Sequence, residues 1–102
     1  MGLPEIVEIW TRSLRVNFES AGVEVVCQRS PPERPNPSVA LNLQRGAVEA
    51  DLLVWESGHA DLSTMSADGS VVQRHFEDLN TVEAIGDVLA VVAGVLPVPA
   101  KK

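Results

Sequence analysis

The spacing of the hydrophobic residues changes twice along the chain. Near the N-terminus, apolar side chains recur near the helical period at Ile6, Trp10, Leu14 and Phe18. This spacing predicts an amphipathic helix over residues 4–21. Proline suits the first turn of a helix and glycine suits its C-terminal cap, and Pro4 and Gly22 occupy these two places.

From about residue 23 to residue 76, apolar and polar residues alternate instead, which is the period of a half-buried strand. The pattern predicts five strands, at about 23–30, 38–44, 50–56, 60–65 and 70–76. Gly46 and the pairs Ser57-Gly58 and Asp68-Gly69 are turn signals between the later strands. Because these links are short enough for hairpins, we expect a sequential antiparallel meander.

The first two predicted strands are joined by residues 31–37, which include four prolines. Proline cannot donate a hydrogen bond to a neighbouring strand, so this segment is a surface connection. A stiff loop is the simpler interpretation, and a proline-rich recognition segment is the alternative.

The helical spacing returns near the C-terminus, at Ile85, Val88, Leu89, Val92, Val95 and Leu96. We expect a second helix over 81–96, with Asn80 as its N-cap, Glu83 at the capping-box position and Pro97 ending it. Residues 97–102 would form a tail. Two helices with apolar stripes and a sheet with one apolar face predict an α+β fold of the order α-β5-α, with both helices packed on one face of the sheet. Residues 1–102 are expected to form a single domain.

The composition is that of a globular domain, and the net charge is −6. A nucleic acid would be repelled by this charge, whereas a basic protein partner would be attracted. Negative charge also serves solubility alone, so this pattern leaves both interpretations open. The lone Cys27 lies in an apolar run and is expected to be a small buried hydrophobe, in a reducing compartment.

Neither an export signal nor a membrane span is expected. Glu5 and Glu8 interrupt the N-terminal apolar residues, and the segment 82–96 has only about fifteen residues and includes charges. We therefore expect a cytoplasmic protein without a membrane partner.

A search for reactive groups predicts no catalytic residue, metal site or cofactor. Neither His59 nor His75 has a second histidine or a cysteine at zinc-ligand spacing. Ser57 or Ser63 with His59 and Asp61 would suggest a triad, but strand alternation is expected to separate these side chains. Glu77 and Asp78, which precede the second helix, are expected to favour its positive end.

The strongest candidate for partner binding is Trp55. If Leu52 and Val54 point toward the helices with Leu41, Leu43 and Leu62, then Leu53 and Trp55 lie on the opposite face near Asp51 and Asp61. A tryptophan among acidic residues is typical of a binding hot spot. The alternatives are that Trp55 belongs to the core or is shielded by the proline loop. The candidate contact residues are Trp55, Asp51, Leu53, Glu56 and Asp61.

The chain also resembles the TriTu family of small bacterial immunity proteins. The resemblance is to a first helix with a tryptophan, a proline loop ending in Asn36-Pro37-Ser38-Val39, the hairpin from Val54 to Asp61, and His75-Phe76-Glu77-Asp78-Leu79 before the last helix. It implies a protein that binds a cognate toxin domain and blocks its active site, without catalytic residues of its own. The oligomeric state expected is a monomer or a weak dimer.

Two other classes remain open from the residues alone. A non-catalytic adaptor or secretion chaperone would also be small and acidic. A small-molecule-binding enzyme would need a concave polar pocket, which a meander of this kind does not predict.

Overall fold

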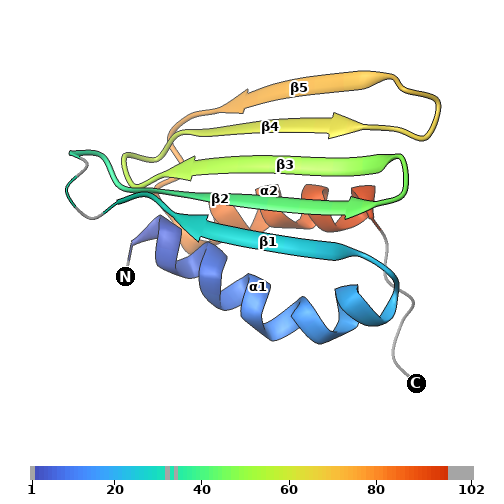
Figure 1. Cartoon of the computed structure of the whole chain (residues 1–102). Helices are drawn as coiled ribbons and strands as arrows, with labels where there is room; N and C mark the ends of the chain where they lie inside the picture. The colour runs from blue at the N-terminus through green and yellow to red at the C-terminus, as the bar shows by residue number, and fades with distance from the viewer. Residues whose placement is uncertain (1, 32, 34, 97–102) are drawn as a thin grey trace.

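Five strands form one antiparallel sheet, and a helix lies at each end of the chain. The computed structural model describes residues 2–31, 33 and 35–96. The order along the chain is α1 (Leu3–Ser20), β1 (Glu24–Arg29), β2 (Ser38–Arg45), β3 (Val48–Trp55), β4 (Ala60–Met65), β5 (Val71–Phe76) and α2 (Val82–Val95) (Figure 1). The order in the sheet is β1-β2-β3-β4-β5, with every neighbouring pair antiparallel, which confirms the predicted α-β5-α meander.

Strand alternation gives the sheet two different faces. The side that faces the helices, called here the helix side, is apolar, and its residues Val39, Leu41, Leu43, Leu52, Val54 and Leu62 are each at most 2% exposed. These residues meet the buried stripes of the helices, including Val7 and Phe18 of α1 and Ile85, Leu89 and Val92 of α2. Removing such side chains from water is the main favourable contribution to folding.

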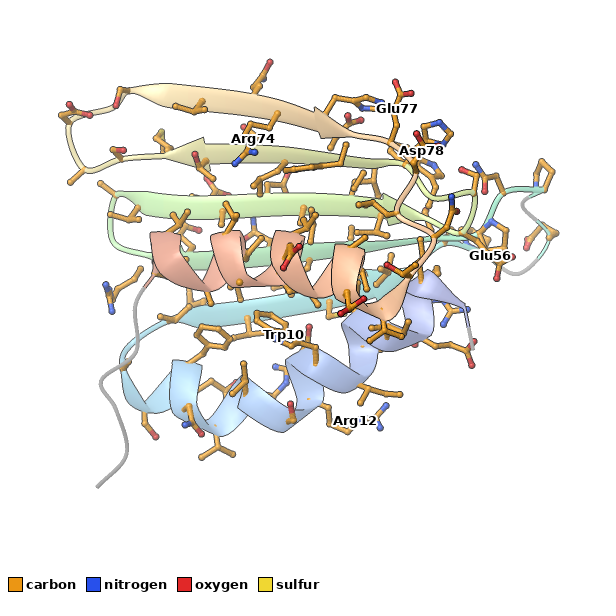
Figure 2. All side chains as sticks on the ribbon, turned by 180° about the vertical axis from the view of Figure 1, so that it is seen from behind. Trp10, Arg12, Glu56, Arg74, Glu77 and Asp78 are labelled. Atoms are coloured by element: carbon orange, nitrogen blue, oxygen red, sulfur yellow. The ribbon has the colours of Figure 1, made fainter. Side chains whose placement is uncertain are left out.

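Both helices lie on the same side of the sheet, as predicted (Figure 2). α1 packs on β1, β2 and β3, and α2 packs on β3 and on α1. β5 extends beyond the two helices, so that Val72 is 55% exposed although it lies on the helix side.

Local signals determine where α1 begins and ends. At its start, the Glu5 carboxylate accepts a hydrogen bond from the Gly2 N–H. At its end, Gly22 has φ +83°, and the N–H groups of Gly22 and Val23 donate to the carbonyls of Glu19 and Phe18. This is the Schellman arrangement, and glycine suits it because a left-handed backbone is strained for other residues.

The N-cap of α2 differs from the prediction. Thr81, and not Asn80, caps the helix: its Oγ1 accepts the N–H of Ala84 at 3.0 Å. Asn80 lies one residue earlier in a tight turn, where its N–H donates to the Asp78 carbonyl. Because the helix begins one residue later than expected, Glu83 is an acidic residue of the first turn and does not complete a capping box.

The remaining differences concern strand ends. β3 begins at Val48, earlier than expected, because Gly46 and Ala47 alone form the turn and Val48 pairs with Arg45. β3 ends at Trp55, so Glu56 belongs to the following turn. The expected tail and the helix-ending Pro97 lie outside the described residues.

Replacing the cap of α2 should weaken the protein. Thr81→Ala is expected to lower the free energy of unfolding by about 1 kcal/mol, because the Ala84 N–H loses its acceptor. Chemical denaturation followed by circular dichroism measures this. Asn80→Ala is the matched control and should cost less; a larger loss in Asn80→Ala would assign the cap to Asn80.

Two glycine-to-alanine changes should have opposite effects, although a Cβ at either position meets nothing within 4 Å. Gly22→Ala is expected to lower the free energy of unfolding by about 1 kcal/mol, because alanine is strained at positive φ. Gly86→Ala, inside α2, is expected to raise it by about 0.5 to 1 kcal/mol. Thermal and chemical denaturation of both variants compare them; equal effects would contradict the conformational argument.

Candidate partner-binding surface

The side of the sheet that faces away from the helices is called here the open face. By strand register, its side chains are Glu24, Val26, Gln28, Ser38, Ala40, Asn42, Gln44, Glu49, Asp51, Leu53, Trp55, Asp61, Ser63, Met65, Val71, Gln73 and His75. They include the carboxylates of Glu24, Glu49, Asp51 and Asp61. The three arginines of the strands, Arg29, Arg45 and Arg74, all lie on the helix side. The described residues of the open face are therefore acidic, without a lysine or an arginine.

A shallow depression of about 500 Å³ lies on this face over β3, β4 and β5. Two registered rows of open-face side chains line it, and Leu62 and Arg74, whose side chains belong to the helix side, also contribute atoms to its lining. One row is Asp51, Ser63 and Gln73, and the next is Leu53, Asp61 and His75. Half-buried Leu53 therefore lies near two exposed carboxylates, as the sequence predicted.

Asp61 forms an ion pair with His75 across the β4–β5 hairpin. The His75 Nδ1–H donates to the Asp61 carboxylate at 2.5 Å, and the Glu77 carboxylate lies 3.5 Å from His75 Nε2. The hydrogen bond to Asp61 raises the pKa of His75 above its ordinary value, and the negative charges of Asp61 and Glu77 act in the same direction. The protonation state of His75 therefore sets the net charge that the Asp61–His75 pair presents to a partner.

Ser57 and His59 also come together, which sequence alternation did not predict. The Ser57 Oγ lies 3.0 Å from His59 Nδ1, and the Asn36 amide donates to the same Oγ at 3.2 Å. Residues two apart share a face even in a strand, so alternation is no reason to separate this pair, and here both residues lie in the β3–β4 turn. Asp61 pairs with His75, so the described residues do not form a serine–histidine–aspartate relay.

Trp55 lies at the end of β3, opposite Ser38 of β2. It is half-buried and is not among the residues that form or pack against the hydrophobic core. The core interpretation of Trp55 is therefore wrong, and by strand register its side chain belongs to the open face.

Glu56 lies apart from the other candidates. A Cβ placed on Gly2 would be 2.7 Å from the Glu56 Oε1, so this carboxylate lies at the N-terminal end of α1 (Figure 2). A negative charge there is favoured by the helix dipole. The structure thus groups Asp51, Leu53 and Asp61 in the depression and places Trp55 further along the same face, but it separates Glu56 from them.

The hairpin that contains these residues is fastened to the β5–α2 connection. The Leu79 N–H donates to the Gly58 carbonyl at 2.9 Å, and a Cβ at Gly58 would be 2.9 Å from the Asn80 Oδ1. Gly58 is buried and has φ +100°, so glycine is suited here for both its conformation and its small size. The end of the open face that includes Trp55 is held in place by this contact.

Other groups do not suggest chemistry. Cys27 is half-buried on the helix side, and burial raises the pKa of its thiol, which makes it a weak nucleophile. Within the described residues, no group of three or more His, Cys, Asp or Glu side chains is placed to hold a metal ion. None of the helices described is long and apolar enough to cross a membrane.

Comparison with family models gives a match to the immunity protein TriTu over residues 5–93. This range includes all five strands and most of both helices. The chain belongs to the TriTu family of immunity proteins. Membership confirms the resemblance found in the sequence and identifies a generally non-catalytic protein, for which the family implies a cognate toxin as partner. Comparison with curated proteins and with solved structures gave no match.

Two pairings on the open face were not predicted from the sequence, although the turns between the strands contain the signal for them. The Asp68-Gly69 turn fixes the β4–β5 register, and counting outward from it pairs Asp61 with His75. The same counting across the β3–β4 turn pairs Asp51 with Ser63.

The pKa of His75 should depend on Asp61. In an NMR titration, Asp61→Asn is expected to lower the pKa of His75 toward its ordinary value, whereas Asp51→Asn should change it less. Because the pKa is raised in the folded protein, the pair stabilises at pH values below the ordinary histidine pKa, and this contribution is lost as the pH rises through the folded pKa. An unchanged pKa of His75 in Asp61→Asn would contradict the assignment.

Proposed function

We propose that this TriTu protein binds a basic surface of its cognate toxin domain with the open face and so covers the toxin's active site. The observation that supports this most strongly is the separation of charge across the sheet. Four carboxylates lie on the open face, while the arginines of the strands lie on the helix side. The helices occupy the helix side, and the open face is free to meet a partner.

Charge and apolar surface would contribute differently to this complex. The net charge of −6 and the open-face carboxylates speed the encounter with a basic surface and orient it. Trp55 and Leu53 supply half-buried apolar area that a partner can desolvate, which mainly slows dissociation. Glu56 is not proposed as a contact, because its carboxylate lies beside α1.

The pH is expected to modulate the attraction. When His75 is protonated, its charge partly neutralises Asp61; when the pH rises above the raised pKa of His75, the face becomes more negative. Affinity for a basic partner is therefore expected to increase with pH through this range.

Binding to a purified cognate toxin domain, sought among the products of neighbouring genes, tests the proposal. Trp55→Ala should weaken binding by about 2 kcal/mol, which is roughly 30-fold. Asp61→Asn should mainly slow association and reduce its dependence on salt. Surface plasmon resonance at several salt concentrations separates the two rates.

Asp87→Asn is the matched control for charge, because Asp87 is an exposed carboxylate on α2. Circular dichroism confirms that each variant is folded. Unchanged affinity in folded Trp55→Ala, Asp51→Asn and Asp61→Asn would remove the open face as the contact surface. Absence of binding by the unaltered protein would refute neutralisation of that toxin by direct contact.

A further inference from the structure

The two edges of the sheet are protected unequally. At the β1 edge, α1 closes the strand: Arg15 Nη1 donates to the Val25 carbonyl at 3.2 Å, and Arg29 forms a 2.7 Å ion pair with Glu8 of α1. The Arg15 hydrogen bond occupies a backbone carbonyl on the edge of β1, and both contacts hold α1 against β1. Another strand cannot approach this edge without displacing them.

Apart from the charge of Arg74, the β5 edge lacks the devices that usually prevent pairing. Val71 and Val72, on opposite faces of the strand, are 56% and 55% exposed, and residues 73–75 are also exposed. The segment from Val71 to Phe76 includes no proline, lysine or acidic residue. The guanidinium of Arg74 lies over the Phe76 ring of the same strand, 4.9 Å from its centroid. An edge of this kind offers backbone N–H and C=O groups to another strand.

We propose that β5 pairs antiparallel with β5 of a second copy, about a two-fold axis at Gln73, and so joins the two sheets into one continuous sheet. In such a pairing, residues on the same face lie opposite each other. An axis at Arg74 would set two guanidinium groups directly opposite each other, which is unfavourable. An axis at Val72 would pair only residues 71–73 of the two strands with each other, whereas an axis at Gln73 pairs residues 71–75.

The axis at Gln73 makes the strand complementary to itself. On the helix side, Val72 lies opposite Arg74 of the second copy, where the aliphatic part of the arginine can cover the valine. On the open face, Val71 lies opposite His75 of the second copy. The two Gln73 amides meet at the axis, and an amide group offers both donors and an acceptor. Both exposed valines of each copy are thereby covered.

The rest of the fold permits this arrangement. The helices pack on β1, β2 and β3, and β5 extends beyond them, so the helices of the two copies lie far from the new contact (Figure 2). A second copy is the occupant we propose because the same five residues, 71–75, pair with themselves about this axis and place each exposed valine opposite a longer side chain. The open face over β3 and β4 remains uncovered, whereas Gln73 and His75 of β5 border both this contact and the depression.

The dimer is expected to be weak, and salt is expected to strengthen it. Pairing of one edge strand buries less than the area of a stable interface, so the dissociation constant should lie between about 10 μM and 1 mM. Each copy has a net charge of −6, so screening reduces the repulsion between them. Binding of a basic toxin has the opposite salt dependence, which distinguishes the two interactions.

Sedimentation velocity of the full chain over the concentration range of about 10 μM to 1 mM tests the proposal. The unaltered protein should shift toward a dimer with concentration and with added salt. Gln73→Lys sets two like charges at the axis and should weaken association at least tenfold. Gln28→Lys is the matched control, because Gln28 is an exposed open-face glutamine on the other edge strand. Its added charge lies away from β5, so this variant should still form the dimer.

Disulfide formation tests the register directly. In a Cys27→Ala background, Gln73→Cys should cross-link two copies under mild oxidation, because directly opposed residues of antiparallel strands have Cα atoms about 4.5 to 5.5 Å apart. Gln28→Cys should not. A monomer at every concentration, or cross-linking through Gln28→Cys in place of Gln73→Cys, would overturn the proposal. Neither result would contradict the proposed binding of a toxin.

Discussion

The fold depends on the two-residue alternation of side chains in a five-stranded meander. Because every link between neighbouring strands from β2 to β5 is a short hairpin, the register of one pair determines the register of the next, and one slip would exchange the two faces of the sheet. The apolar set, with Leu41, Leu52 and Leu62 in one row, is buried against the helices. The same alternation sends Asn42, Asp51 and Ser63 to the opposite side. Core and candidate partner surface are therefore produced by one constraint.

The helices contribute a second constraint, which is their limited width. Two helices cover β1, β2 and β3, and the sheet is wider than this layer. β5 is consequently exposed on both faces, while β1 is closed by Arg15. The molecule thus has two surfaces with different properties: the acidic open face, and the β5 edge with its two exposed valines.

The repeating parts of the structure could be predicted from the sequence, because each follows from a period. Helices, strands and the choice of Leu52 and Val54 as inward residues all came from spacing. Details set by a single turn could not be predicted in this way. Asn80 and Thr81 are both good N-caps, and the choice between them depends on the tight turn at Asp78. Ser57 and His59 meet in the β3–β4 turn, whose shape follows from no period.

The residues of the candidate site also divide into those placed by strand register, which could be predicted, and those placed by other contacts, which could not. Asp51, Leu53 and Asp61 were grouped correctly because they follow strand register. Glu56 was grouped with them by sequence proximity, but it lies after the last residue of β3 and its carboxylate reaches α1. A tertiary contact between residues 2 and 56 leaves no local signal in the sequence.

Hydrogen–deuterium exchange of this protein, with and without a cognate toxin domain, tests most directly whether the open face binds the toxin. Binding is expected to slow exchange in β3, β4 and the β3–β4 turn, where Asp51, Asp61 and Trp55 lie or adjoin, and to leave α1 and α2 unchanged. Slower exchange confined to the helices, with β3 and β4 unaffected, would contradict the proposal that the open face binds the toxin.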